Sequence, residues 1–491
     1  MSPQKDADKS TTLKAMKLRN NCPAAKKCGG CSFAGKTYFE QTIAKEKRVV
    51  KLLEPFCEVL PIDHCEHPLY YRNKVHSAFK RLRNGRVICG PYETGSHRIV
   101  ETDSCLIENK IASSIIRDCA DIAGKLKISI YNETKGFGDL RRILVRTADA
   151  TGEVMVVLII GSNYFAKKKA FTDELLKRHP EITTLLININ KRHDSMILGS
   201  DEVKKVKGNG YITDEILGKK FRVSADSFMQ SNHEQAEILY SEAIRLAEFD
   251  GTEVCIDAYC GTGSTTLTFA GYVGSITGVE IKESAYKDAL KNTSVNKVKN
   301  ASFVNGDATE YMENLAKNNA KIDCVILDPT RAGTTVRFIK ACGRLKPSKI
   351  VYISCCPETL ARDLKGFEAQ GYKTRTAVPV DMFPWTDSVE TIVILSKLSS
   401  APKLEVRIKM SDLDLTEAEA KATYEEIQEY VKQQTGLHVT HLNIAQIKRK
   451  HGIIERSNYN FPKSENSRQP NCPPEKEKAI VAALKHFKMI E

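Results

Sequence analysis

Several features of other protein classes are missing from this 491-residue sequence. No apolar run reaches the length of a membrane span, and the longest, near residues 156–161, is as short as a strand. The N-terminus, MSPQKDADK, lacks the hydrophobic core of a signal peptide. We therefore expect a cytoplasmic protein without a membrane segment. Its 15 cysteines should then be reduced, so clustered ones are expected to bind a metal or to act in catalysis.

Two nucleotide-binding motifs are incomplete. The turn at residues 260–264, C-G-T-G-S, contains G-x-G but not the full G-x-G-x-x-G/A dinucleotide fingerprint, and the G-K-[ST] of a P-loop is absent. A nucleoside ligand without a pyrophosphate fits this turn better, and S-adenosylmethionine is the commonest such ligand. The net charge of +13 suggests a polyanionic partner.

The N-terminal part combines a basic tail with a cysteine cluster. Residues 1–20 are polar and basic, and we expect them to be disordered. Cys22, Cys28 and Cys31 follow with the spacing C-x5-C-x2-C, which differs from the C-x3-C-x2-C of radical enzymes. Zinc and iron–sulfur sites both use four cysteines, and the spacing leaves both open. The nearest candidates for a fourth ligand are Cys57, Cys65, Cys89 and Cys105.

Residues 21–236 predict an α+β domain rich in antiparallel strands. A helix is expected over 36–54, and residues 137–161 contain two β runs around a turn. The alternating, cationic stretch 68–83, P-L-Y-Y-R-N-K-V-H-S-A-F-K-R-L-R, is typical of a strand. It could contact single-stranded RNA, or it could be a solvated basic edge strand.

Residues 237–399 predict a doubly wound, mainly parallel sheet. Short apolar strands alternate with helices, beginning at the glycine turn, and acidic residues close three strands. Glu280 lies about 20 residues past the turn, where it can bind ribose hydroxyls. Asp307 and Asp328 end the next two apolar runs. Residues 400–491 read as a separate C-terminal α+β extension with a strand, three helices and a basic cluster at 448–450.

The segment 351–363, V-Y-I-S-C-C-P-E-T-L-A-R-D, organises the rest of the chain. It predicts a buried strand that ends at Cys355 and Cys356, followed by a helix that Pro357 can start. Ligands bind at such strand ends, and a helix N-terminus can lower the pKa of a thiol. The alternative is two small buried residues. Glu390, just before an apolar β run, either has a function or is an ordinary surface residue at a strand end.

A thiol and a carboxylate beside S-adenosylmethionine permit one specific reaction. C5 of uracil is a poor nucleophile until a thiolate adds to C6 and makes C5 enolate-like. After methyl transfer a base must remove the C5 proton so that the thiol can leave. Cys355 and Glu390 suit these two tasks, and Asp328 and Gln230 could hold the ring.

The motifs, in their order along residues 22–395, resemble the RNA uracil-5 methyltransferases of the TrmA/RumA type. The matching stretches are C-x5-C-x2-C at 22–31, D-S-C-L-I at 103–107, F-M-Q-S-N at 228–232, D-A-Y-C-G-T-G at 257–263, L-D-P-T-R-A-G at 327–333, S-C-C-P-E-T-L-A-R-D at 354–363 and M-F-P-W-T-D-S-V-E at 382–390. The resemblance implies a Rossmann-like methyltransferase sheet after an iron–sulfur and RNA-binding domain, in a monomer that acts on RNA.

The resemblance also implies roles for individual residues. Cys355 would be the nucleophile, with Cys356 where the family usually has Asn, and Glu390 the general base. Bound substrate and cofactor would contact Gln230, Tyr259, Gly261, Glu280, Asp307 and Asp328. A [4Fe–4S] cluster would be held by Cys22, Cys28, Cys31 and Cys105.

The departures from the family concern the RNA target. The family often has H-T-x-H-V-E where this chain has W-T-D-S-V-E, and the short members lack residues 400–491. We expect methylation of uracil C5 in 23S rRNA. A tRNA T-loop uridine is the first alternative, although tRNA-specific bacterial members usually lack the cysteines. A cytosine-5 methyltransferase and an inactive RNA-binding module fit less well, because Gln230 and both reactive residues are present.

Overall fold

The protein is described by a computed structural model that places residues 14–102, 104–192, 194, 196–199, 203–397, 424–451, 472–487 and 489–490. The chain divides into a larger unit, Met1–Ser399, and a smaller unit, Ser400–Glu491. Among the placed residues, no helix is both long and apolar enough to cross a membrane. Most of the predicted N-terminal tail and the strand expected after residue 400 lie outside the described residues.

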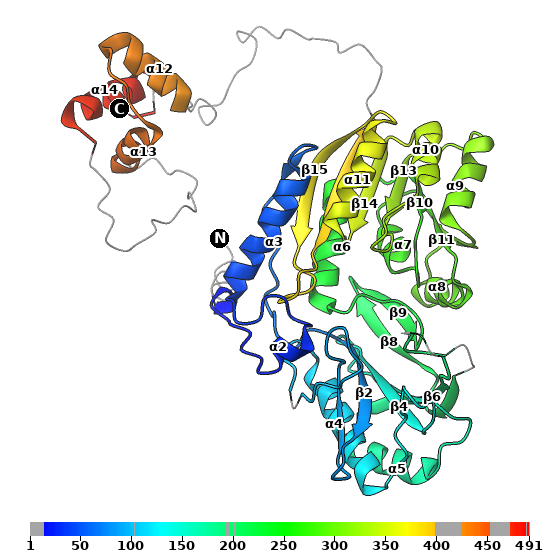
Figure 1. Ribbon diagram of the computed structural model, residues 1–491. Helices are drawn as coiled ribbons and strands as arrows, with labels where there is room; N and C mark the ends of the chain where they lie inside the picture. Colours follow the sequence, from blue (N-terminus) through cyan, green and yellow to red (C-terminus); the bar gives the residue numbers. More distant parts are fainter. Residues whose placement is uncertain are drawn as a thin grey trace. The chain divides into compact units, whose positions relative to one another are not determined.

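An eight-stranded sheet forms one half of the larger unit (Figure 1). Its strand order is β1-β15-β16-β14-β13-β10-β11-β12, in which β10 to β14 run parallel and β16 is antiparallel to both of its neighbours. The strands are β10 (Val254–Asp257), β11 (Ser275–Glu280), β12 (Ala301–Asn305), β13 (Cys324–Leu327), β14 (Lys349–Ser354), β15 (Tyr372–Val380) and β16 (Glu390–Lys397). The strand order reverses at β10, which confirms the predicted doubly wound, Rossmann-like sheet.

Helices connect these strands. They are α6 (His233–Ala247), α7 (Ser264–Phe269), α8 (Glu283–Asn296), α9 (Ala308–Lys317), α10 (Val336–Leu345) and α11 (Pro357–Glu368). Several begin at side-chain caps: Asn232 accepts a hydrogen bond from Gln235 N, and Thr335 accepts one from Phe338 N. Such caps satisfy backbone donors that the first turn leaves free. Asn232, the last residue of the stretch F-M-Q-S-N, is therefore a helix cap.

The N-terminal segment does not keep to the predicted domain boundary at residue 236. Helix α3 (Tyr38–Leu53) begins with the capping box of Thr37 and Glu40 and contacts α11 and β15. Strand β1 (Glu58–Val59) pairs with β15 at the edge of the eight-stranded sheet. Val49 and Leu53 lie in one hydrophobic cluster with residues of β10, β13, β14, β15 and β16. Burial of these apolar side chains attaches the segment to the eight-stranded sheet.

A six-stranded sheet forms the other half of the larger unit, in the order β3-β2-β4-β5-β6-β7. These strands are β2 (Lys74–Arg81), β3 (Val87–Gly90), β4 (Leu140–Thr147), β5 (Val154–Ile160), β6 (Ile182–Ile189) and β7 (Lys204–Lys207). The predicted hairpin of 137–161 is β4 and β5, and every residue of both strands is buried. Because β2 pairs on both sides, the alternative of a basic edge strand is wrong.

The two sheets share a core, which explains why they form one unit. Helices α4 (Lys110–Lys125) and α5 (Lys168–Arg178) contact each other beside the six-stranded sheet. The short helix α2 (Ala25–Cys28) lies near the same sheet (Figure 1). The hairpin of β8 (Tyr211–Ile216) and β9 (Lys219–Ser224) contacts β5 and β6 on one side and α8 on the other. Leu144, Phe221 and Val351, one from each layer, belong to one continuous cluster.

The smaller unit has its own core. Its described helices are α12 (Tyr424–Thr435), α13 (His441–Lys450) and α14 (Pro474–His486), which pack mainly through Ile427, Val431, Ile444, Ile447, Ile480 and Leu484. Helix α12 ends just before Gly436, which has a φ of 70°.

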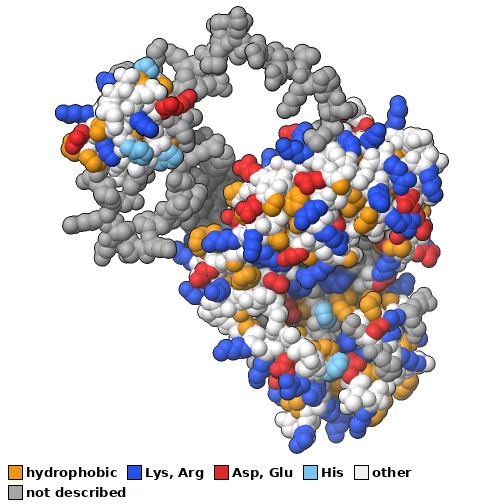
Figure 2. All heavy atoms as spheres, turned by 45° about the horizontal axis from the view of Figure 1, so that its top comes forward, with side chains coloured by type: hydrophobic (Ala, Val, Ile, Leu, Met, Phe, Trp, Pro, Cys, Tyr) orange, Lys and Arg blue, Asp and Glu red, His pale blue; other side chains and the backbone are white. Residues whose placement is uncertain are grey.

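Two residues of the basic cluster at 448–450 have partners inside this unit. Lys448 is only 6% exposed, with its amino group 4.3 Å from the centre of the Tyr424 ring, and is therefore little available to a nucleic acid. Lys450 forms an ion pair with Glu477, and its side chain stays 64% exposed. Blue Lys and Arg side chains are also spread over the visible face of the larger unit (Figure 2).

The resemblance to the RNA methyltransferases implies that removal of residues 400–491 leaves catalysis intact. Both sheets lie in the larger unit, so kcat and S-adenosylmethionine affinity are expected to stay unchanged. The slope of the logarithm of RNA affinity against the logarithm of salt concentration should change by less than the contribution of one phosphate contact, which is about 0.7–0.9. Filter binding at several salt concentrations measures this slope. A larger flattening, with folding retained, would make the smaller unit an RNA contact.

Candidate active site

The glycine turn after β10 lies where the strand order of the eight-stranded sheet reverses. Gly261 and Gly263 have φ values of 56° and 83°, a region that favours glycine. A Cβ on Gly263 would also come within 3.0 Å of the Phe303 ring. The Gly261 N–H donates to Oε2 of Glu280 at 3.0 Å, which fixes this carboxylate beside the turn. The turn and the acidic end of β11 are thus brought together as the sequence predicts.

Asp307 and Tyr259 flank the same edge of the sheet. Asp307 caps α9 by accepting from Glu310 N at 3.0 Å, and one of its oxygens remains for a ligand. The Tyr259 hydroxyl lies 3.0 Å from Oγ1 of Thr334, and the charge of Asp307 helps to raise the pKa of Tyr259 after burial. These residues offer acceptors for hydroxyl and amine groups of a nucleoside.

Asp257, at the end of β10, is a functional candidate that sequence reasoning did not single out. It is fully buried; Oδ2 accepts from Thr266 at 2.6 Å, while Oδ1 has no hydrogen-bond partner among the described residues. Burial raises the pKa of Asp257 to about 7. The signal was present, because Asp257 opens the motif D-A-Y-C-G-T-G. A buried carboxylate with one free oxygen suits a cationic or hydrogen-bonding ligand.

Cys355 follows β14 directly and lies just before α11, as predicted. Burial, to which the nearby carboxylates of Glu390 and Asp328 add, raises the pKa of Cys355 to about 12. The expectation that the helix N-terminus lowers this pKa is therefore wrong for the free protein. The dipole of a helix contributes at most about 2 kcal/mol, and burial beside two carboxylates outweighs it. The thiol needs a base to take its proton.

Glu390 is a buried carboxylate and Asp328 a half-buried one, and the charges of both act on the Cys355 thiol. Burial raises the pKa of both, and the charge of Asp328 raises the pKa of Glu390 further. Oε2 of Glu390 has no hydrogen-bond partner among the described residues. Glu390 is only 3% exposed, so the reading of a surface residue at a strand end is wrong. A buried carboxylate with a raised pKa and a free oxygen is suited to proton transfer.

Arg331 is a second residue that sequence reasoning missed, although its motif L-D-P-T-R-A-G was noted. Its positive charge acts on both Cys355 and Glu390 and counteracts the rise in their pKa values. The Arg331 guanidinium donates to Oγ of Ser388 at 2.6 Å. The backbone carbonyl of Arg331 accepts from the Thr359 hydroxyl at 3.1 Å. Arg331 can therefore stabilise negative charge that develops near the thiol.

Gln230 lies in the segment between β9 and α6. It is 5% exposed and lines a small cavity with Asn73 and Arg146, and its carbonyl accepts from Asn73 at 3.4 Å. The same segment touches the glycine turn, because Thr262 donates to the Phe228 carbonyl at 3.4 Å. None of these contacts joins Gln230 to Cys355.

Strand β2 brings positive charge close to this segment. Arg72 pairs with Asn232 as an isolated bridge just before the strand. Burial, to which the charges of Arg146 and Lys282 add, lowers the pKa of Lys74 to about 7. Like charges gathered at partly buried positions are costly, and a polyanion would relieve the cost.

The four cysteines of the predicted cluster are neighbours. Burial raises the pKa of Cys31 to about 11, with Cys28 and Cys22 adding to it. Burial and then Glu108 raise the pKa of Cys105 to about 12, and Cys31 contributes as well. Cys65 belongs to the hydrophobic cluster against which Cys31 and Cys105 pack, with its Sγ 3.8 Å from the Asn232 amide, whereas Cys89 acts on Cys119. The charge of Cys31 acts on Cys105, which joins Cys105 to the group.

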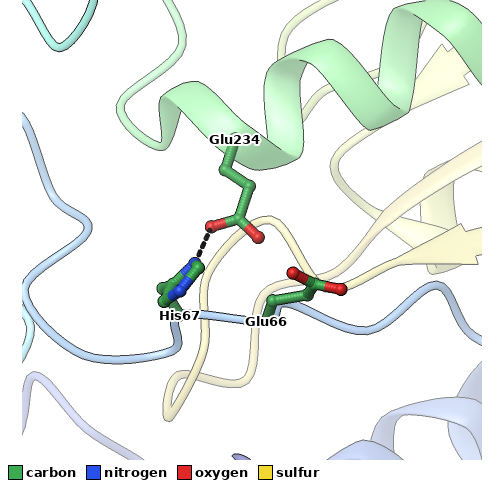
Figure 3. A group of neighbouring side chains, drawn as sticks. All are labelled: Glu66, His67 and Glu234. Carbon is green, nitrogen blue, oxygen red and sulfur yellow. Dashed lines mark hydrogen bonds and ion pairs between the residues drawn. The ribbon is translucent and has the colours of Figure 1, made fainter. Parts of the chain in front are cut away.

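Glu66, His67 and Glu234 form a different group of possible metal ligands (Figure 3). Nδ1 of His67 lies 3.0 Å from Oε2 of Glu234, and the His67 side chain is 72% exposed. No residue of the group was predicted as a ligand. An exposed ion pair accounts for its geometry, so we assign it no function.

Comparison with known proteins places the chain among RNA-modifying enzymes. Residues 166–398 match the tRNA (Uracil-5-)-methyltransferase family. An uncharacterized RNA methyltransferase of Bacillus cereus is 37% identical over 382 residues, 77% of this chain and 83% of the relative. One of Halalkalibacterium halodurans is 37% identical over 379 residues, 76% and 82% of the two chains.

A solved structure shows the same fold. The Pyrococcus abyssi tRNA (uracil-54, C5)-methyltransferase, in complex with S-adenosyl-L-homocysteine, is 26% identical with a TM-score of 0.62. The match covers 75% of this chain and 85% of that one. The fold and the strand-end site therefore define an S-adenosylmethionine-dependent RNA methyltransferase. Within that class, the chain belongs to the RNA uracil-5-methyltransferase family.

Proposed function

We propose that this protein methylates C5 of a uracil in 23S rRNA, with Cys355 as nucleophile and Glu390 as general base. The observation that carries the mechanism is the thiol of Cys355 beside the carboxylates of Asp328 and the buried Glu390, of which Glu390 has an oxygen without a partner among the described residues. A thiol next to a base is the arrangement that nucleophilic catalysis requires. The intact pair also argues against an inactive RNA-binding module.

Each side chain has one task in the reaction. A neighbouring carboxylate accepts the Cys355 proton, and the thiolate adds to C6 of the uracil. The positive charge of Arg331 stabilises the enolate that forms, since it already acts on both reactive groups. S-adenosylmethionine supplies the methyl group that C5 acquires. Glu390 then takes the C5 proton, the C6–S bond breaks, and Cys355 leaves as a thiolate.

The residues around the glycine turn fit S-adenosylmethionine. Glu280 and Asp307 end adjacent strands and offer carboxylate oxygens to ribose hydroxyls and to the adenine amine, as the sequence suggests. The unpaired oxygen of Asp257 provides a further acceptor in the same place. The turn lacks the sequence of a pyrophosphate site, which agrees with a nucleoside ligand.

The RNA target can be identified by mapping 5-methyluridine in RNA from a deletion strain. Loss of the modification from 23S rRNA alone is the expected result. The Pyrococcus abyssi relative acts on tRNA, and this observation makes tRNA the second candidate. Loss from the tRNA T loop, with 23S rRNA unaffected, would select that alternative. Methylation retained in both RNAs would refute the proposed function.

We also propose that Cys22, Cys28, Cys31 and Cys105 hold a [4Fe–4S] cluster. A Cβ on Gly29 would come within 2.0 Å of Thr94 Oγ1, and one on Gly30 within 3.3 Å of Cys28 Sγ, so the loop closes tightly around the thiols. The resemblance to family members that carry such a cluster, whose four cysteines these match in sequence, supports a cluster over a zinc ion.

Anaerobically purified protein is therefore expected to be brown. Iron–sulfur thiolate ligation should give a broad absorbance near ~400 nm, with iron and acid-labile sulfide in equal amounts. Cys105→Ser should reduce the iron content, whereas Cys57→Ser, the matched control outside the group, should not. A colourless protein with one zinc would overturn the proposal.

A further inference from the structure

The loop that leads into Glu390 is attached to the N-terminal segment of the chain. Residues 381–389 connect β15 to β16, and Glu390 is the first residue of β16. Trp385, the only tryptophan of the sequence, lies in the middle of this loop and is fully buried. Its φ of 71° is a left-handed conformation that a bulky side chain rarely adopts. Such a backbone persists only where its surroundings hold it in place.

All three polar groups of Trp385 bind residues of the N-terminal segment. The indole Nε1–H donates to the Pro68 carbonyl at 2.8 Å, and the backbone N–H donates to Oε1 of Gln41 at 3.2 Å. The backbone carbonyl accepts from Phe33 N at 3.0 Å. Phe33 follows Cys31 by two residues, so the cysteine-bearing loop itself holds the Trp385 backbone.

A buried ion pair holds the start of the same loop. Lys45, on α3, donates to Oδ1 of Asp381 at 2.5 Å and to the Phe383 carbonyl at 2.9 Å. Gln41 donates to the other oxygen of Asp381 at 2.7 Å. The Tyr71 hydroxyl donates to the Pro384 carbonyl at 2.9 Å. Residues outside its own sheet thus fix the loop at Asp381, at the two carbonyls that follow, and at Trp385.

Packing connects the loop to the cysteines as well. Trp385 shares a small hydrophobic cluster with Tyr38 and Tyr71, and Cys31 and Cys105 pack against that cluster. The Tyr38 and Trp385 rings meet edge to face at 5.7 Å. The cysteine site and the loop of the proposed base therefore rest on the same aromatic side chains.

We propose that Trp385 is a positioning residue for Glu390 and that the cysteine-bearing segment holds Trp385 in place. The inference rests on the proposed role of Glu390 as the base. Tryptophan replaces the histidine that the family often has at this place, so the aromatic anchor is a feature of this chain. Displacing the anchor shifts the loop and with it the carboxylate, while Cys355, on a different strand end, keeps its place.

The test measures how the covalent intermediate divides between trapped adduct and free product. Wild type and Trp385→Ala are mixed with uracil-containing RNA and methyl-labelled S-adenosylmethionine, denatured, and separated. We expect Trp385→Ala to form the adduct within about twofold of the wild-type rate but to accumulate it at least fivefold, because elimination is slowed. Trp385→Phe keeps an aromatic ring but loses the hydrogen bond to the Pro68 carbonyl, so this variant should accumulate less adduct than Trp385→Ala.

Tyr372→Ala is the matched control. Tyr372 is a buried aromatic residue of β15 whose hydroxyl also donates to backbone carbonyls, those of Cys342 and Pro347. This variant should lower the Tm without changing the fraction of adduct. Folded Trp385→Ala and Trp385→Phe with the wild-type fraction of adduct would overturn the positioning role.

The fluorescence of Trp385 tests, independently of Glu390, whether the cysteine-bearing segment holds Trp385 in place. Because the chain has one tryptophan, its emission reports on this loop alone. Cys31→Ser should shift the emission to longer wavelength as water reaches the ring, whereas Cys57→Ser should leave it unchanged. An unshifted emission in Cys31→Ser would overturn the connection to the cysteine segment. Failure of Glu390→Gln to accumulate adduct would instead refute the base, and the fluorescence result would stand.

Discussion

Replacing Cys355 by alanine is expected to abolish methylation, whereas replacing Cys356 is expected to leave most of it. Cys355 lies beside Glu390 and Asp328, the groups that can take its proton. Cys356 is the N-cap residue of α11, and its Sγ lies 3.5 Å from Glu358, which pairs with Arg48 on α3. Loss of a nucleophile that works with a base costs roughly 10⁴-fold or more in kcat. Methyl transfer to RNA under saturating conditions measures this loss.

A 5-fluorouracil-containing RNA gives the sharper readout for the same pair of variants. Fluorine replaces the C5 proton, so elimination fails and the adduct persists after denaturation. Wild type and Cys356→Ala should form this adduct, and Cys355→Ala should not. An adduct that survives in Cys355→Ala and disappears in Cys356→Ala would move the nucleophile to Cys356.

The pH dependence of adduct formation follows from the resting state of the thiol. Burial and two carboxylates raise the pKa of Cys355, so the thiol is protonated near neutral pH. The thiolate is the attacking form, and the carboxylates can accept its proton only when they are ionised. The rate should therefore rise with pH over about pH 6 to 9. This rise belongs to the prediction for Cys355, since it requires the thiol.

The parallel sheet was predictable because its signals are local. Each of β10, β13 and β14 is a short, wholly or mostly buried apolar run, and each is followed by glycine, proline or a helix cap. Connections of this kind leave few topologies, and the switch point follows from them. The position of β1 was not predictable, because a two-residue strand carries no periodic signal and is fixed by its pairing with β15.

The positions of the candidate site residues were predictable where a local motif marks a strand end. Cys355, Glu390 and Asp328 lie at strand ends that motifs identify, and the structure brings them together. The raised pKa of Cys355 was not predictable, since it depends on burial and on carboxylates that are distant in sequence. The anchoring of Trp385 was not predictable for the same reason, because the N-terminal residues that bind it lie more than 300 positions away along the chain.

Glu390→Gln is expected to trap the enzyme on its substrate rather than to prevent attack. Asp328 remains beside Cys355 to accept the thiol proton, so addition and methyl transfer proceed. The amide that replaces the carboxylate cannot accept the C5 proton, and the C6–S bond then does not break. A denaturation-stable protein–RNA adduct that carries the labelled methyl group should accumulate, with free product reduced by about 10²–10⁴-fold.

The pH dependence of the wild type should reproduce this trap. Burial, and then the charge of Asp328, raise the pKa of Glu390 above its ordinary value, so a fall in pH protonates the base well before an exposed glutamate would titrate. Elimination needs the ionised form, which is populated above that pKa and lost below it. The adduct fraction of wild type should therefore increase as the pH falls from about 8 to 6, while that of Glu390→Gln, which has no carboxylate to titrate, should stay high throughout. Quenching both reactions across this range and separating adduct from free RNA gives the two curves. Free methylated product released by Glu390→Gln at the wild-type rate would remove Glu390 from the mechanism and leave Asp328 as the group that takes the C5 proton.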